Sequence, residues 1–329
     1  TQTIDIRTRR TTPADTQESS RLGTLCMFAA VYTLALIVFG GIVRITGSGM
    51  GCGDDWPRCN GEWIPAFTLE TLIEYTHRLL AAGIGIVVLA VFAYAFTHRR
   101  RPGVAGPGGS LRPLAIGGAL LLVQIALGAI TVRLELPPPV TVAHFITALL
   151  FMATLIVAAV RAGALGHPRQ ARSGIAAGAS RQAWRMAAAA AALGLVVVSF
   201  GALTANTPAA PQACRGFPLC NGQLVPPASM PPAHVHWTHR VVAFLLFFHV
   251  LGANWAAART QLGSTVHTAA VTTLGLLTLQ LAVAAALVTL PLPPRLQALH
   301  LAIGAAIWFS LVTWAALARR DAEQLHSLP

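Results

Sequence analysis

The chain has 329 residues, of which 55% are hydrophobic and only 10% are charged, and its mean hydropathy is +0.63. Because soluble domains carry about a quarter of charged residues, this composition excludes an ordinary soluble protein. All 23 basic residues are arginines, and the net charge is +12. They gather in the segments between apolar stretches, a pattern typical of membrane topology. We therefore expect the lipid bilayer, and no nucleic acid, as a partner.

Eight apolar windows follow one another along the chain, each about as long as the 20 residues or so that span a bilayer. They cover residues 22–45, 71–97, 113–134, 139–161, 183–205, 234–257, 265–290 and 296–318. Irregular backbone cannot face lipid, so each window predicts a helix. We expect an all-α polytopic membrane protein with eight transmembrane helices.

Arginine-rich segments precede the first window, separate the second from the third and the fourth from the fifth, and follow the sixth and the eighth. The positive-inside rule makes these segments cytoplasmic. Both termini are then cytoplasmic, and the loops 46–70, 135–139, 206–233 and 291–295 are extracytoplasmic. The first 20 residues are polar, so we expect no cleavable signal peptide and a multi-pass protein of the plasma (inner) membrane.

The two halves of the chain repeat each other. A Cys-Asn-Gly block recurs after 161 residues, a Thr-His-Arg block after 162 and a Leu-Pro-Pro block after 156. This register indicates a tandem duplication. We predict a tail at 1–21, an N-terminal four-helix bundle at 22–161, a linker at 162–182, a C-terminal four-helix bundle at 183–318 and a tail at 319–329. An even number of spans per copy makes the copies parallel, so a pseudo-two-fold axis along the membrane normal should relate them.

Each copy carries two histidines near the outer ends of different helices, His77 and His144 in the first and His239 and His300 in the second. Ionisable residues inside a membrane are functional by default, although a lone histidine often only hydrogen-bonds a neighbouring helix. Two imidazoles that face each other in a bundle can hold a haem iron. Zinc would need three or four ligands, whereas copper stays open. We predict that each pair binds the iron of a tetrapyrrole.

The copies differ at Glu74, three residues before His77, because the equivalent residue is His236. A carboxylate is costly to place in a membrane and therefore indicates a task. It could accept a proton, orient a water molecule or stabilise positive charge near a reacting carbon. Alternatively, it pairs with Arg78 or lies at a solvated helix end. We predict a catalytic first copy and a second copy that serves in electron transfer or in structure.

Four of the five cysteines fall in the two long outer loops. Cys52 and Cys59 share one loop, and Cys214 and Cys220 share the other. On an oxidising side of the membrane such pairs predict two disulfides; free thiols or metal ligands are the alternatives. Cys26 lies alone in the first helix and is expected to be a small buried apolar residue.

Two further pairs of polar residues recur in the repeat. Arg78 and Arg240 directly follow a histidine, and they either pair with haem propionates or snorkel to the outer headgroups. Gln124 and Gln280 occupy equivalent mid-helix positions and are expected to form hydrogen bonds between helices.

Longer motifs surround these residues. The second helix contains Glu74-Tyr75-Thr76-His77-Arg78, a Glu-x-x-His-Arg motif. The first outer loop contains Gly41-Ile42-Val43-Arg44-Ile45-Thr46-Gly47-Ser48-Gly49, then Cys52, Trp56-Pro57, Cys59-Asn60-Gly61 and Pro65. Together with the other three histidines, these motifs resemble the haem A synthase family, and the resemblance covers all eight helices.

The resemblance implies an oxidoreductase that converts haem O to haem A for terminal oxidases. One ring methyl would become a formyl group through successive hydroxylations. His77 and His144 would hold the substrate haem O beside Glu74, and His239 and His300 would hold a haem b cofactor. Both cysteine pairs would be the loop disulfides of the cysteine-containing bacterial branch.

The implied partners are a haem O synthase that delivers the substrate, cytochrome oxidase assembly factors, and an electron acceptor that the residues leave open. The main alternative is a b561-like cytochrome that transfers electrons without substrate chemistry. It would place haems in both leaflets and would have no need of Glu74, whereas all four histidines here fall near one face. A transporter or haem chaperone would not explain the added carboxylate.

Overall fold

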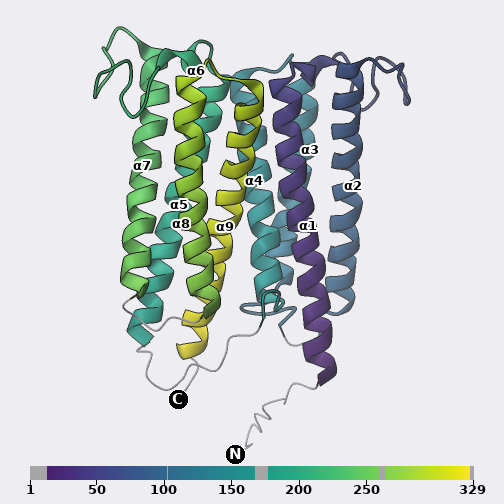
Figure 1. Ribbon diagram of the computed structural model, residues 1–329. Coiled ribbons are helices and arrows are strands. Elements are labelled where there is room, and N and C mark those ends of the chain that lie inside the picture. Colours follow the sequence, from purple (N-terminus) through teal and green to yellow (C-terminus); the bar gives the residue numbers. More distant parts are fainter. Residues whose placement is uncertain (1–12, 102, 167–176, 259–263, 327–329) are drawn as a thin grey trace, which may run out of the picture.

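The computed structural model describes residues 13–101, 103–166, 177–258 and 264–326, and helices dominate them (Figure 1). Eight of these helices are long and apolar enough to cross a membrane, so the prediction of a polytopic all-α membrane protein is confirmed. The long helices are α1 (Pro13–Ile45), α2 (Leu69–Thr97), α3 (Leu111–Arg133), α4 (Pro138–Arg161), α5 (Ala177–Asn206), α7 (Pro231–Ala258), α8 (Ser264–Thr289) and α9 (Pro294–His326).

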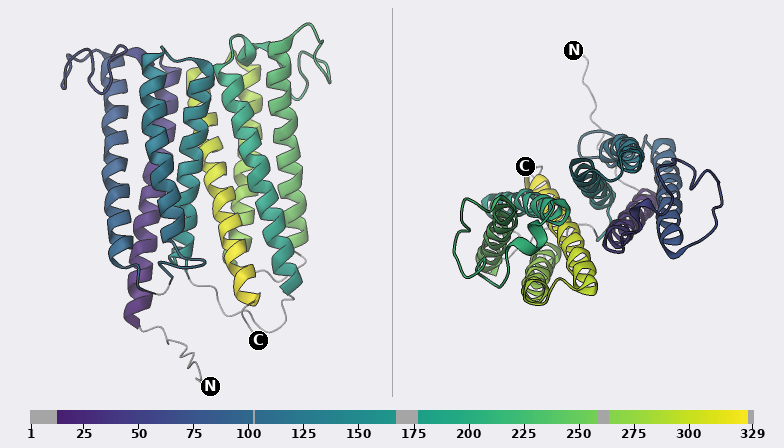
Figure 2. Two further views of the ribbon diagram at one scale, coloured as in Figure 1. Left: turned by 180° about the vertical axis from the view of Figure 1, so that it is seen from behind. Right: turned by 90° about the horizontal axis from the view of Figure 1, so that it is seen from above.

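The long helices form two groups, α1 to α4 and α5 with α7, α8 and α9. The view from above shows the two groups side by side (Figure 2). In the first group α4 packs against α1 and α3, and α1 also contacts α2. In the second group α9 packs against α5 and α8, and α7 contacts α5 and α8. Each group has its own buried apolar cluster. The pseudo-two-fold axis between them stays a prediction.

The two groups are joined mainly through α9. Trp308 of α9 is 4% exposed and belongs to the buried cluster of the first group. Its indole Nε1 donates a hydrogen bond of 2.9 Å to the carbonyl oxygen of Leu149 in α4. Nearer the disulfide loops, a guanidinium nitrogen of Arg44 lies 3.4 Å from the carbonyl oxygen of Ala205 in α5. The copies therefore pack against each other along much of their length.

Several helix ends differ from the apolar windows. α1 begins at Pro13, and α9 continues to His326, so helix occupies part of both predicted tails. Helical hydrogen bonding does not require apolar side chains, and the i,i+4 pair of Arg319 and Glu323, 2.7 Å apart, stabilises the polar end of α9. Residues 1–12, 167–176 and 327–329 lie outside the described part, and with them the middle of the predicted linker and the outer portions of both tails.

Two short helices in the outer loops were not predicted. They are η1 (Ser48–Met50) in the first loop and α6 (Ala210–Ala213) in the second. Both loops lie at one end of the molecule, and the start of α1 and the end of α9 lie at the other (Figure 1).

Candidate functional site: histidine pairs beneath disulfide loops

The four histidines lie at matched positions because their helices start at matched signals. α4, α7 and α9 each begin with a proline, which suits the first turn because its missing N–H would have no helical partner. α2 begins at the Thr68 cap, whose hydroxyl accepts from the amide of Thr71 at 3.2 Å.

His77 and His239 are each the ninth residue of their helix, and His144 and His300 are each the seventh. A rise of about 1.5 Å per residue makes a two-residue offset worth roughly 3 Å. The two histidines of each copy therefore lie at nearly the same depth below the loops. Two imidazoles at one depth could hold a single group between them.

The second pair has a geometry that suits an iron between the rings. The ring centroids of His239 and His300 are 6.5 Å apart, and the ring planes are at 79°. Metal–imidazole nitrogen distances of about 2 Å on both sides give centroids roughly 6–6.5 Å apart. His239 Nδ1 lies 3.1 Å from the carbonyl oxygen of Val197. This contact orients the ring and leaves Nε2 for a metal.

The first pair is enclosed in a similar way. The ring of His77 stacks on Phe39, with centroids 6.2 Å apart. His144 Nε2 lies 3.1 Å from the amide nitrogen of Gln124 in α3. The Nδ1 atoms of His77, His144 and His300 are buried and have no hydrogen-bond partner within the described part of the chain. Such atoms indicate a group that completes the site.

Glycines make room for three of the four rings. A Cβ added at Gly40 would lie 3.1 Å from His77 Cε1, and one at Gly201 would lie 3.0 Å from His239 Cε1. These two glycines are 161 residues apart, in register with the repeat. Gly128 stands similarly against His144, at 3.2 Å. The neighbouring helix can approach each ring only because these positions carry no side chain.

The glutamines do bond between helices, but in different ways. Gln124 contacts the His144 ring, whereas Gln280 Nε2 donates to the backbone carbonyl of His300 at 2.9 Å. In both, Oε1 is buried without a partner in the described residues. Gln124 thus holds one ring nitrogen of the His144 side chain, and Gln280 bonds the backbone of the helix turn that carries His300.

The Cys-Asn-Gly motif closes each loop with a tight turn. Asn60 and Gly61 have φ of 53° and 81°, and Asn221 and Gly222 have 54° and 77°. Asn-Gly favours the two-residue turn in which both residues have positive φ. Cys59 and Glu62 exchange two backbone hydrogen bonds of 2.9 and 3.1 Å across this turn, and Cys220 and Gln223 do the same.

Both cysteine pairs form disulfides in the structure, Cys52 with Cys59 and Cys214 with Cys220. All four residues are at most 2% exposed. Cys26 is free and fully buried. The described residues contain no group of three or more His, Cys, Asp or Glu that could hold a metal ion. The described part of the chain therefore gathers no set of zinc ligands, and binding of a tetrapyrrole by the histidine pairs stays a prediction.

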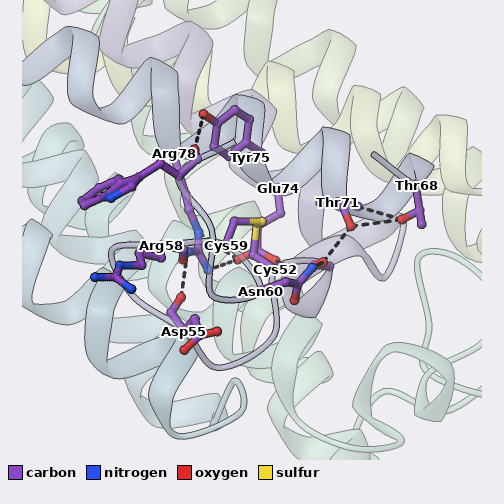
Figure 3. The surroundings of a disulfide bond; sticks show 12 residues. Cys52, Asp55, Arg58, Cys59, Asn60, Thr68, Thr71, Glu74, Tyr75 and Arg78 are labelled. Carbon is purple, nitrogen blue, oxygen red and sulfur yellow. Dashed lines mark hydrogen bonds and ion pairs between the residues drawn. A yellow bond between two sulfur atoms is a disulfide. The ribbon is translucent and has the colours of Figure 1, made fainter. Parts of the chain in front are cut away.

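Arg78 and Arg240 bind the loops, a role that sequence reasoning missed; Figure 3 shows Arg78 beside the first loop. Arg78 Nη1 donates to the carbonyl oxygens of Asp55 and Arg58 at 2.8 and 2.7 Å. Arg240 donates likewise to the carbonyls of three second-loop residues, Gly216, Leu219 and Cys214. The repeat of the two arginines is visible in the sequence, but it does not identify the loop carbonyls as their partners. Propionate contacts of either arginine stay a prediction.

A second pair of side-chain donors, Tyr75 and Trp237, also forms hydrogen bonds to the outer loops. The Tyr75 hydroxyl donates to the Trp63 carbonyl at 2.8 Å, and Trp237 Nε1 donates to the Leu224 carbonyl at 2.7 Å. Trp237 is the repeat equivalent of Tyr75. The duplicated loops therefore keep the same backbone anchors although the donor side chains differ.

Glu74 joins the first loop to the helix that carries His77. Its side chain is buried, and Oε2 accepts a hydrogen bond of 2.9 Å from the Cys52 amide. Oε1 forms an ion pair of 2.5 Å with Arg78. The pairing with Arg78 that the sequence offered as an alternative is therefore present. The carboxylate links a disulfide cysteine to the helix turn next to His77 (Figure 3).

The second copy has no such carboxylate. His236 is 6% exposed, and its Nδ1 lies 3.1 Å from the carbonyl oxygen of Ala210. Arg240 is also buried, and among the described residues no Asp or Glu lies within ion-pair distance of it. Because His236 occupies the position equivalent to Glu74, the second copy lacks the negative charge that the first copy carries at this position beneath its loop.

Comparison with known proteins decides the family. Residues 23–69 and 64–312 match the COX15-CtaA model, described as cytochrome oxidase assembly protein. The chain belongs to this family. It is 33% identical to the heme A synthase of Symbiobacterium thermophilum over 236 residues, which are 70% of this chain and 73% of the relative. It is 30% identical to that of Alkalihalophilus pseudofirmus, over 73% and 77%, and 31% identical to that of Bacillus mycoides, over 71% and 73%.

Proposed function

We propose that this COX15-CtaA family protein is a haem A synthase, an oxidoreductase that oxidises a ring methyl of haem O to the formyl group of haem A. The main support is that two histidine pairs lie at matched positions beneath the loops. In addition, relatives of the chain are named heme A synthase. A b561-like electron carrier is less well supported, because all four histidines lie toward one end and a transmembrane relay would need haems toward both.

In this proposal His239 and His300 hold a resident haem b, and His77 and His144 hold the substrate haem O. The 6.5 Å separation of the second pair and the Val197 carbonyl that orients His239 support the cofactor site. The unpartnered Nδ1 atoms of His77 and His144 support the substrate site. When bound, haem b supplies one-electron redox chemistry, which no side chain here provides.

The reaction places two demands on the first copy. Two successive hydroxylations of one methyl give a geminal diol, and each is a two-electron oxidation whose electrons must pass to an external acceptor. Loss of water from the diol then leaves the aldehyde. A proton acceptor must serve these steps, and bulk water must stay away from the oxidised carbon. Glu74 is the acid nearest along the chain to the substrate histidines, and it anchors the disulfide loop at the same end of the bundle. We assign it the catalytic role.

We further propose that the protein lies in the plasma (inner) membrane with both termini cytoplasmic and the disulfide loops extracytoplasmic. The arginine distribution supports this orientation. A haem O synthase would supply the substrate, and oxidase assembly factors would receive haem A. The domain division at 162–182 fits the two helix groups.

Haem extraction from membranes tests the function. Cells that make haem O but lack haem A would express this chain, and extracted haems would be separated by chromatography and identified by mass. Haem A is expected only with the intact chain, and His77→Ala should leave haem O unconverted. Bound haem b with haem O unchanged in the wild type would overturn the synthase proposal in favour of the electron carrier.

A further inference from the structure

A cavity lies between the two helix groups, at the end opposite the disulfide loops. Its volume is about 450 Å³, within the range of roughly 300–1,000 Å³ that is usual for small-molecule sites. Its walls come from α4, α5 and α9 and from glycines of the adjoining loops, and seven of the fifteen lining residues are valine or alanine. Small side chains such as Ala188 and Ala315 leave the space open. It is separate from the histidine pairs, which lie toward the other end of these helices.

The rim of the cavity is basic. Arg161 ends α4, and Arg319 and Arg320 lie in the polar extension of α9. Arg161 donates to the Gly109 carbonyl at 3.2 Å, and among the described residues no carboxylate lies within ion-pair distance of it. Glu323, which pairs with Arg319, is the acidic residue of the lining. The rim thus carries more positive than negative charge.

The other two arginines keep donor capacity for a ligand. Arg320 Nη1 donates to the Gly166 carbonyl at 2.7 Å, but its Nε is buried and has no hydrogen-bond partner in the described part of the chain. Oδ1 of Asp321 lies 3.5 Å from that Nε, so the two side chains form an ion pair but no hydrogen bond. The guanidinium of Arg319 lies 5.8 Å from the ring centroid of Trp184, a residue type common at membrane interfaces.

We propose that this cavity binds an anionic phospholipid, with the phosphate among the three arginines and part of an acyl chain between α4, α5 and α9. Guanidinium groups match phosphate geometry, and basic pockets between transmembrane helices bind anionic headgroups. The apolar walls suit an acyl chain and not a free anion. Because α4 belongs to one group and α5 and α9 to the other, the lipid stabilises the contact between the two copies.

Native mass spectrometry of the delipidated, haem-loaded protein tests this proposal. Phosphatidylglycerol is expected to bind at least about fivefold more tightly than phosphatidylcholine with the same chains. Arg161→Gln and Arg319→Gln should each weaken phosphatidylglycerol binding about fivefold, the effect expected for one basic residue near a membrane surface. Arg100→Gln is the matched control, because it removes an exposed arginine from the same end outside the cavity, and it should leave binding unchanged.

Ala188→Leu fills the apolar part without changing charge and should weaken both lipids. Equal binding of the two lipids by the wild type would overturn the proposal, as would an equal loss in Arg100→Gln. Displacement of phosphatidylglycerol by inorganic phosphate at the same concentration would identify a free-anion site instead. The haem absorption spectrum of each variant reports whether it is folded, and the wild-type comparison of the two lipids needs no variant.

Discussion

Substitution of Glu74 separates its anchoring role from its chemical role. Glu74→Ala leaves the buried Cys52 amide without an acceptor and Arg78 without its carboxylate. An unsatisfied buried donor costs about 1–3 kcal/mol. Breaking a fully buried ion pair costs about 3–5 kcal/mol, but Arg78 is 15% exposed and keeps two carbonyl acceptors. We therefore expect Glu74→Ala to lower the free energy of unfolding by about 2–4 kcal/mol.

Glu74→Gln is the matched variant, because its amide oxygen can still accept part of the three hydrogen bonds that Cys52 and Arg78 donate to the Glu74 carboxylate. Its stability loss should be about 1 kcal/mol, while the negative charge is gone. Thermal unfolding of the purified protein measures stability, and haem extraction measures turnover. We expect Glu74→Gln to stay folded, to keep haem b and to accumulate haem O. Wild-type haem A from Glu74→Gln would refute the catalytic role, and wild-type stability of Glu74→Ala would refute the anchoring role.

Other variants address the rest of the site. His300→Ala should abolish the bis-histidine haem b spectrum of the purified protein, and an unchanged spectrum would contradict the cofactor assignment. Gly201→Ala places a Cβ 3.0 Å from the His239 ring, and this overpacking should cost about 1–3 kcal/mol and reduce haem b retention. Gly275→Ala is the control, because nothing lies within 4 Å of its added Cβ. It should retain haem and gain up to about 1 kcal/mol of stability. Thiol labelling of the denatured, unreduced protein should modify Cys26 alone; labelling of a loop cysteine would contradict the disulfides.

The local sequence was sufficient to predict the membrane-spanning helices and the distance along the helix between each histidine and the outer loops. Apolar length predicts each helix because lipid leaves backbone groups no other partner. The prolines and Thr68 that start the four helices place each histidine at a fixed number of residues from the loops. The Asn-Gly turns are likewise local, since both residues need positive φ.

Only the tertiary structure decided what the polar side chains contact. Arg78 and Arg240 reach loop carbonyls some 20 residues away, and Gln124 and Gln280 bond different atoms of equivalent histidines. Such contacts depend on how helices and loops meet, which spacing along one helix does not encode. The repeat determined where two sites lie. Packing decided that Glu74 ties the first disulfide to its helix, while Arg240 in the second copy binds three backbone carbonyls of its loop.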